Sequence, residues 1–220
     1  MKVLLVEDDP SLREGMEEVI AELVGVRTVA SVDSALAALR AERFDLVLAD
    51  LRIGGAATGG RTILEAARRQ LQPVAIVSAA APEEIRRALQ PFEADALLGK
   101  PFQLEEMTEL VERFLSLRTE LEQLASQRPG EGAWTQAPAG GQVARAPASE
   151  GQAWWVRLPA GASVTWPVSE GQIGCLILEG DLEIAGERQQ ATRYFFLSAG
   201  QSQEARTEKG CLVVALALGG

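Results

Sequence analysis

The sequence predicts an α/β fold, a doubly wound five-stranded parallel sheet, followed by a second domain that is an all-β barrel. Two observations predict this division. In the first half, five short apolar runs alternate with helical patterns, as in sheets built from βα units. In the second half, the helical pattern stops and turn residues separate short apolar runs, which is typical of a small sandwich or barrel.

The apolar runs of the first half are typical of strands that are buried on both faces of a sheet. Helix starts have their own signals: Asp9 and Ser31 supply N-cap oxygens, and Pro82 precedes two glutamates in a first turn. The expected strands are residues 2–7, 26–30, 45–50, 73–78 and 95–99. The expected helices lie near residues 11–23, 33–41, 60–70, 83–90 and 103–127.

Polar residues follow four of these strands: Glu7 and Asp8, then Asp50, Ser78 and Lys100. Open α/β sheets bind ligands at the carboxyl ends of their strands, so these side chains predict one acidic site. Converging carboxylates would repel one another and raise their pKa values unless a cation were present. The alternatives are that Asp8 caps the first expected helix, that Asp50 is a solvated loop acid and that Ser78 is a turn residue.

Asp9 has a simpler interpretation than its neighbours. It directly precedes Pro10 and Ser11 at the start of the first expected helix. Aspartate is a preferred N-cap residue, because its side chain accepts a hydrogen bond from a free backbone N–H. We therefore expect Asp9 to cap the helix and leave Asp8 to the acidic site.

Four segments of the first half, VEDDP, LVLADLR, IVSAA and LLGKPF, occur in the order and spacing of a known family. On these motifs residues 1–118 resemble a response-regulator receiver domain, which has a flavodoxin-like fold. The resemblance implies that Asp50 is the nucleophile that a histidine kinase phosphorylates. It also implies a Mg²⁺ ion with these ligands: Glu7, Asp8, Asp50 and the backbone carbonyl of Arg52.

The same resemblance assigns the remaining polar groups of the site. Lys100 would pair with a phosphate oxygen, and the Ser78 hydroxyl would reorient toward another. Lys100–Pro101 would be a cis peptide bond. Leu97 stands at the switch position where the family usually carries an aromatic residue, which puts the usual coupling between serine and ring in doubt.

Residues 119–130 are expected to be an extension of the fifth helix and a linker. An apolar seam with spacings of 4, 3, 4 and 3 continues into this extension, over Leu110, Phe114, Leu117, Leu121 and Leu124. Leu121 and Leu124 lie beyond the first domain, so they should pack either on the following domain or on a second copy of the chain.

The second half, residues 131–220, resembles the cupin domain of ChrR-type anti-sigma factors through RLPAGASVTW, LILEGDLEIAG, RYFFLSAGQ and EKGCLVVALA. That family binds metal with three histidines and a glutamate. Its ligand positions correspond to Pro167, Ser169, Ile173 and Gln203, none of which can serve as the family's ligand. The resemblance therefore implies a cupin without metal, and it excludes metal-dependent cupin chemistry.

Aromatic residues are concentrated in the second half and allow three interpretations. They could line an apolar ligand pocket in the barrel mouth, fill the core, or form a homodimer face. The residues are Trp134, Trp154, Trp155, Trp166, Tyr194, Phe195 and Phe196.

Composition excludes several classes of function. The formal net charge is −10 and neither half is basic, which disfavours a DNA-binding output. The chain has no histidine, the commonest metal ligand and general base. Cys175 and Cys211 lie in apolar segments and are expected to be reduced core thiols. No apolar run is long enough for a membrane helix, so we expect a cytoplasmic protein.

The leading hypothesis is a two-component response regulator, not an enzyme apart from phosphotransfer to its own aspartate. Its metal-free cupin output would act through protein contacts or dimerisation. The expected partners are a histidine kinase, a second copy of the chain and a downstream protein. One candidate for the downstream protein is a sigma or anti-sigma regulator. Neither DNA nor a membrane is an expected partner. An alternative makes the cupin domain a small-molecule sensor that tunes the receiver. Residual metal-free cupin catalysis ranks last.

Overall fold

The structure, a computed structural model, describes residues 1–220 except 56–57, 138–139, 147–152, 167–170, 201–202 and 219–220. It divides into two compact units, Met1–Leu115 and Ser116–Gly220. Helix α5 (Leu104–Ala125) begins in the first unit and ends in the second. Among the helices that the structure describes, none is both long and apolar enough to cross a membrane.

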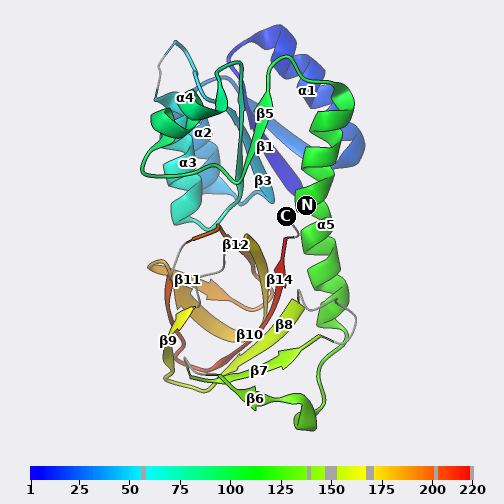
Figure 1. Cartoon of the computed structure of the whole chain (residues 1–220), viewed down its shortest axis with the longest axis vertical. Coiled ribbons are helices and arrows are strands. Elements are labelled where there is room, and N and C mark those ends of the chain that lie inside the picture. Colours follow the sequence, from blue (N-terminus) through cyan, green and yellow to red (C-terminus); the bar gives the residue numbers. More distant parts are fainter. Residues whose placement is uncertain (56–57, 138–139, 147–152, 167–170, 201–202, 219–220) are drawn as a thin grey trace. The chain divides into compact units, whose positions relative to one another are not determined.

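The first unit is a five-stranded parallel sheet with the strand order β2-β1-β3-β4-β5 (Figure 1). This order is that of a flavodoxin-like doubly wound sheet. The strands are β1 (Lys2–Val6), β2 (Gly25–Val29), β3 (Leu46–Asp50), β4 (Val74–Ser78) and β5 (Ala96–Gly99). The helices between them are α1 (Pro10–Leu23), α2 (Val32–Ala41), α3 (Gly59–Arg69) and α4 (Pro82–Leu89). The predicted α/β fold of this half is confirmed.

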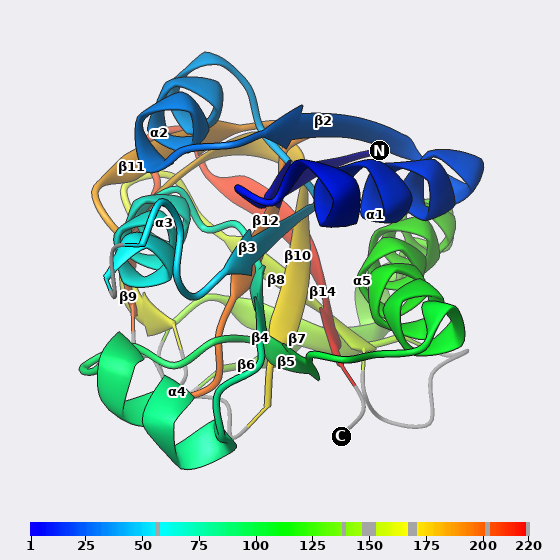
Figure 2. The same cartoon turned by 90° about the horizontal axis from the view of Figure 1, so that it is seen from above.

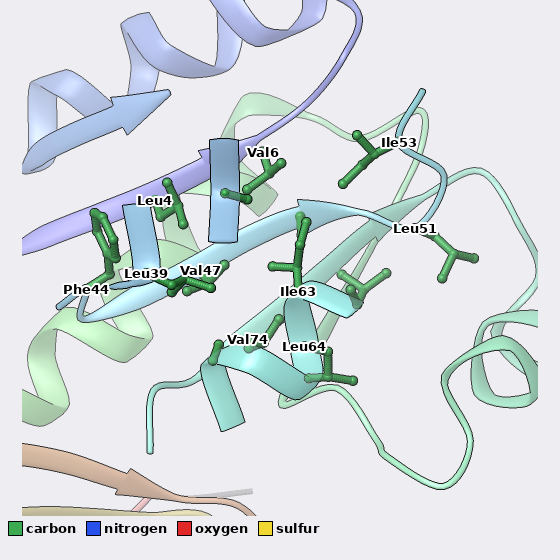
Figure 3. Packing of buried hydrophobic residues seen from close by; sticks show 14 of the residues in the cluster. Leu4, Val6, Leu39, Phe44, Val47, Leu51, Ile53, Ile63, Leu64 and Val74 are labelled. Carbon is green, nitrogen blue, oxygen red and sulfur yellow. The ribbon is translucent and has the colours of Figure 1, made fainter. Parts of the chain in front are cut away.

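Helices cover both faces of this sheet: α1 and α5 lie on one side, and α2 and α3 on the other (Figure 2). On the second side, apolar side chains of the strands meet those of α2, α3 and α4 in one cluster. Leu4, Val47 and Ile63 are completely buried there (Figure 3). Because strand side chains alternate between faces, a strand covered on both sides is apolar throughout, which explains the unbroken runs in the sequence.

The helix starts follow the cap residues that the sequence predicted. The Asp9 side chain accepts a hydrogen bond from the Leu12 N–H at 2.9 Å, and Ser31 accepts one from the Ser34 N–H at 3.2 Å. Each cap satisfies one of the backbone donors that a helix start leaves without a partner. The prediction that Asp9 is a cap is confirmed.

The second unit is all-β apart from the end of α5 and a short 3₁₀ helix (Glu131–Ala133). Its antiparallel strands follow the order β6-β7-β8-β14-β10-β13-β9, with β11 and β12 also paired to β10. The bounds are β6 (Thr135–Gln136), β7 (Gln142–Arg145), β8 (Ala153–Leu158), β9 (Ser163–Trp166), β10 (Ile173–Ile184), β11 (Glu187–Gln190), β12 (Tyr194–Leu197), β13 (Gln203–Arg206) and β14 (Cys211–Ala217). An all-β second domain is thereby confirmed.

Strand β10 is shared by two sets of partners, and this curls the sheet. Its first part pairs with β12 and β14, and its last four residues pair with β11 and, in part, with β13. The register with β14 shifts between Ile177 and Glu179. A bulge of this kind bends a strand and increases its twist, which allows one long strand to serve both parts of a half-barrel.

The second half of α5 packs on β10 within the second unit. A Cβ placed at Gly174 would lie 2.7 Å from Leu117 Cδ2 and 3.0 Å from Leu121 Cδ1, so helix and strand are in direct contact there. Leu117, Leu121 and Leu124 are all buried. Of the two predicted coverings for the seam, the structure shows the following β-domain.

The two cysteines are free and buried, as predicted for core thiols. Burial raises the pKa of the Cys175 thiol, and burial with a contribution from the Asp181 carboxylate raises that of Cys211 to about 12. Both thiols therefore stay protonated at neutral pH, which makes them poor nucleophiles.

Candidate functional site

Four neighbouring strands bring the predicted polar residues to one edge of the first unit's sheet. Glu7 follows β1, Asp50 ends β3, Ser78 ends β4 and Lys100 follows β5. All four strands are parallel, so their carboxyl ends lie at the same edge. Strand register therefore gathers residues that are up to 93 positions apart in the chain.

A carboxylate cluster forms the centre of this site. One carboxylate oxygen from each of Glu7, Asp8 and Asp50 lies within 4.8 Å of the other two. Glu7 is buried, Asp50 is partly buried and Asp8 is exposed. Oxygen ligands at this spacing fit a hard divalent cation such as Mg²⁺, which binds to one or two carboxylates and keeps several waters.

Lys100 is the cation that the cluster already contains. Its ammonium donates to Glu7 Oε2 at 2.7 Å and also to Asp50 Oδ2. Burial raises the pKa of Glu7 above its ordinary value, although Lys100 opposes this shift. Burial lowers the pKa of Lys100, but the hydrogen bonds to Asp50 and Glu7 outweigh that effect and the pKa is raised. Lys100 therefore remains charged at neutral pH.

Backbone contacts hold the carboxylates in place. The Arg52 N–H donates to Asp50 Oδ1 at 2.9 Å, and the Gly54 N–H donates to Asp8 Oδ2 at 2.9 Å. Arg13 donates from Nη1 to the Glu7 carbonyl at 2.8 Å. Sequence reasoning missed Arg13 and Gly54. For Arg13 the available signal was its place in the first turn of the helix that follows Glu7.

The start of α3 lies very close to the end of β3. A Cβ at Gly60 would lie 2.7 Å from the Asp50 carbonyl oxygen and 2.8 Å from Leu51 Cα. Real Cβ atoms do not approach other atoms this closely, so a larger residue would push α3 away from the residue that carries the central carboxylate. The glycine at this position thus contributes to the placement of Asp50.

Ser78 and Leu97 occupy neighbouring strands beside the cluster. The Ser78 side chain is buried and its Oγ accepts a hydrogen bond from the Ala80 N–H at 3.1 Å. Leu97 pairs with Ile76 in the sheet and is 41% exposed. The Lys100–Pro101 peptide bond is cis, as expected from the sequence resemblance.

The structure keeps the side chain of Asp9 out of the carboxylate cluster, although its backbone N–H donates to Glu7 Oε1 at 3.2 Å. Asp9 is absent from the carboxylate cluster formed by the described residues, in agreement with its role as a cap. Arg52 lies two residues after Asp50, to which its N–H donates. That its carbonyl is a metal ligand stays a prediction.

Four residues of the second unit were predicted to stand where the cupin family carries its metal ligands, and the structure places two of them. Pro167 and Ser169 lie outside the described residues. Ile173 is buried at the start of β10, where it pairs with Leu197 and Ala217. Gln203 begins β13, opposite Trp166. Their correspondence to metal-ligand positions remains a prediction from resemblance.

The aromatic residues of the second unit have different degrees of burial. Trp155, Phe195 and Phe196 are among the largest fully buried side chains of the protein, which favours the core-packing interpretation for these three. Trp134, Trp154 and Tyr194 are partly exposed. The side chain of Trp166 lies outside the part of the structure that is described.

Comparison with known protein families gives a match over half of the chain. The model of the response regulator receiver domain matches residues 3–112, which include every predicted residue of the acidic site. The match ends before the second unit begins, so it carries no information on the β-domain.

Curated relatives resemble the same half of the chain. The transcriptional activator protein PfeR of Pseudomonas aeruginosa is 39% identical over 109 residues, which are 48% of this chain and 35% of that protein. The probable C4-dicarboxylate response regulator DctR of Bacillus subtilis is 32% identical over 126 residues, 55% of each protein. The chain therefore spans between about a third and about half of these relatives' lengths.

Solved structures also resemble this half. The receiver domain of a Pseudomonas aeruginosa sensor histidine kinase, solved with a magnesium ion coordinated in its active-site cleft, is 24% identical. It matches with a TM-score of 0.48 over 52% of this chain and 97% of that domain. The receiver domain of NtrX from Brucella abortus is 26% identical with a TM-score of 0.47, over 52% of this chain and 98% of that domain.

Proposed function

Because the chain belongs to the response regulator receiver domain family, we propose that it is a two-component response regulator that accepts a phosphoryl group on Asp50. The observation that carries this proposal is the meeting of three carboxylates and one ammonium group at the edge of the sheet. The donor would be a phosphohistidine of a partner kinase. We expect no other turnover.

The chemistry follows from the charges at the site. Asp50 would attack the phosphorus atom, the nitrogen–phosphorus bond of the donor would break, and an acyl phosphate would form on Asp50. Bound Mg²⁺ would neutralise the negative charges that the transfer brings together, and Glu7, Asp8 and Asp50 are the residues that would hold it, with the Arg52 carbonyl as a further candidate.

Lys100 and Ser78 would respond to the new phosphoryl group. Lys100 shares its ammonium between Glu7 and Asp50, so it is placed to pair with an oxygen added to Asp50. Ser78 would exchange its hydrogen bond with the Ala80 N–H for one to the phosphoryl group. A phosphoryl group adds about −1.5 to −2 charges, which suffices to shift a two-state element.

The output is proposed to be the second unit, a cupin-like domain without metal that acts through protein contacts or dimerisation. Helix α5 supports this route, because it starts four residues after Lys100 and ends against β10 of the β-domain. The acidic charge of the chain supports a protein partner over DNA. The partner kinase and the downstream protein are left unspecified by this proposal.

The acceptor is tested with a small phosphodonor. Three proteins are incubated with acetyl phosphate and Mg²⁺ and separated on a phosphate-affinity gel: wild type, Asp50→Asn and Asp33→Asn. The last is the control, because it alters an exposed acid in the first turn of α2. We expect a retarded band, the mark of phosphorylated protein, for wild type and Asp33→Asn and none for Asp50→Asn. A retarded band that persists in Asp50→Asn, or disappears in Asp33→Asn, would refute Asp50 as the acceptor.

The output step is tested separately with beryllofluoride and Mg²⁺. We expect the phosphate mimic to change the oligomeric state or the hydrogen exchange of α5, and Asp50→Asn to abolish the change. If the mimic binds to the wild type but changes neither, the coupling fails while the acceptor role stands.

A second candidate function, small-molecule sensing by the β-domain, is supported by a cavity in that unit. The cavity has a volume of about 830 Å³, which is within the range of small-molecule sites. It differs from the pocket that the sequence suggested, since among the aromatic side chains that the structure describes in the second half only Trp134 lines it.

A further inference from the structure

The cavity of the second unit is lined by the segment that follows α5 and by five strands of the β-domain. Arg128, Glu131 and Trp134 come from that segment. The strands contribute Gln136 of β6, Gln142 of β7, Arg157 near the end of β8, Glu179 of β10 and the start of β14. A molecule bound here would therefore contact both the residues after α5 and the sheet.

The charge of the cavity has the opposite sign to that of its domain. Residues 116–220 contain 8 Lys or Arg and 11 Asp or Glu. Three of those cations, Arg128, Arg157 and Lys209, line the cavity together with only two carboxylates, Glu131 and Glu179. A concave site with excess positive charge on an acidic protein concentrates small anions.

The two arginines have weak partners that a ligand could replace. Arg128 pairs with Glu179, and their side chains are 53% and 57% exposed. Arg157 lies 3.4 Å from Glu131, with side chains that are 39% and 87% exposed. Exposed ion pairs of this kind contribute about 0–1 kcal/mol, so an anion that binds two guanidinium groups at once would displace them at little cost.

Lys209 adds a cation that the protein itself does not use. The Lys209 ammonium forms no ion pair with any described residue. The Arg157 guanidinium lies over the Trp134 ring, 4.2 Å from its centre, and this contact orients Arg157. Lys209 and the oriented Arg157 are thus both available to an anion in the cavity.

We propose that this cavity is a binding site for a small polyvalent anion, a polycarboxylate or a phosphorylated metabolite, held by Arg128, Arg157 and Lys209. It goes beyond phosphorylation of Asp50 and does not depend on it, because every lining residue belongs to the second unit. Since Arg128 lies three residues beyond the end of α5, the anion would tie the chain after that helix to the sheet.

The test uses the full-length protein and isothermal titration calorimetry, without added divalent cations. The probes are citrate for the carboxylate class, inorganic pyrophosphate for the phosphate class and glucose as an uncharged control. The variants are Arg157→Gln and Arg128→Gln. The matched control is Arg206→Gln, which removes the same charge from an exposed position on β13 outside the cavity.

We expect at least one anionic probe to bind with a dissociation constant of about 1 mM or below, and glucose not to bind. Each cavity variant should weaken that binding about tenfold, because it removes a charge-assisted hydrogen bond, and Arg206→Gln should change it less than about twofold. Binding of citrate alone or of pyrophosphate alone identifies the ligand class.

Three outcomes would overturn the proposal: no binding of either anion at about 10 mM, equal weakening by Arg206→Gln, or equal binding of glucose. If Arg157→Gln fails to fold, Arg128→Gln and Lys209→Gln carry the same test. Phosphorylation of Asp50 is measured by a separate assay, so the two proposals fail independently.

Discussion

Gly174 of β10 and Leu117 of α5 pack so closely that a single added carbon would lie 2.7 Å from Leu117 Cδ2. The contact joins α5, which begins four residues after Lys100, to β10, the longest described strand of the β-domain. Close packing of this kind is possible only where one partner has no side chain. It identifies the position at which α5 and the sheet fix each other.

The first prediction concerns this contact. Gly174→Ala should destabilise the second unit by about 1–3 kcal/mol through overpacking. Leu117→Ala in the same chain should recover part of the loss, because it removes the atoms that clash, although Leu117→Ala alone should cost about 2–5 kcal/mol. Urea denaturation of the four proteins in this cycle measures the coupling.

The control is Gly132→Ala, since a Cβ at Gly132 would meet nothing within 4 Å. It should change the free energy of unfolding by less than about 0.5 kcal/mol. Equal effects of Gly174→Ala and Gly132→Ala would show that close packing is not the cause.

The second prediction separates two adjacent acids. Asp8 belongs to the carboxylate cluster, whereas Asp9 caps α1. Asp8→Ala should weaken Mg²⁺ binding by about tenfold or more, because it removes a charged ligand. Asp9→Ala should leave Mg²⁺ affinity within about twofold but cost about 1 kcal/mol of stability. Calorimetric Mg²⁺ titration and thermal unfolding of both variants distinguish the roles, and a reversed pattern would contradict them.

The third prediction concerns pH and the Asp181 carboxylate. This buried side chain accepts hydrogen bonds from the Lys209 N–H at 2.9 Å and the Glu208 N–H at 3.3 Å, and it pairs with Arg188. The Lys209 backbone N–H makes the largest contribution to lowering the pKa of Asp181 below its ordinary value of 3.8, with further contributions from Arg188 and Glu208.

The lowered pKa of Asp181 determines whether stability rises or falls with pH. Above pH 3.8 the carboxylate is ionised in the folded and unfolded chains alike, and its stabilising effect is complete. Below pH 3.8 the unfolded chain binds the proton first, so stability is lost as pH falls toward the folded pKa. Asp181→Asn should be less stable than wild type at pH 7, and this difference should shrink below pH 3.8. A difference that stays constant from pH 7 to about pH 2 would contradict the assignment.

The fourth prediction compares two neighbouring arginines of α3. Arg68 and Asp95 form a buried pair at 3.3 Å, with side chains that are 8% and 1% exposed, while the Arg69–Glu65 pair lies on the surface. Arg68→Gln should destabilise the first unit by about 3–5 kcal/mol, because it leaves the Asp95 charge buried without its partner. Arg69→Gln should cost less than about 0.5 kcal/mol. Similar losses, measured by urea denaturation, would refute the distinction.

Most of the first unit and its site could be predicted from the sequence, because the signals are local. Unbroken apolar runs such as residues 46–49 predicted strands buried on both faces, and Asp9 and Ser31 predicted helix starts. The side chains at strand ends predicted the acidic site, since parallel strands place their carboxyl ends at one edge.

Other features had no local signal. Gly54 contacts Asp8 across 46 positions, and Arg157 of β8 stacks on Trp134, which precedes β6. Neither pair shares a motif or a periodicity, because the contact depends on how distant segments come together. The same holds for the cavity charge, since Arg128, Arg157 and Lys209 are unremarkable surface residues in the sequence.

By itself the sequence determined the order of strands and helices, the caps, and the type and order of the acidic residues, because these follow from side-chain periodicity and backbone chemistry within short segments. Only the tertiary structure decided that Leu117 and Leu121 pack on β10 and that three cations line one cavity. The physical reason is that burial and local charge are properties of surfaces built from several segments, and no single segment specifies them.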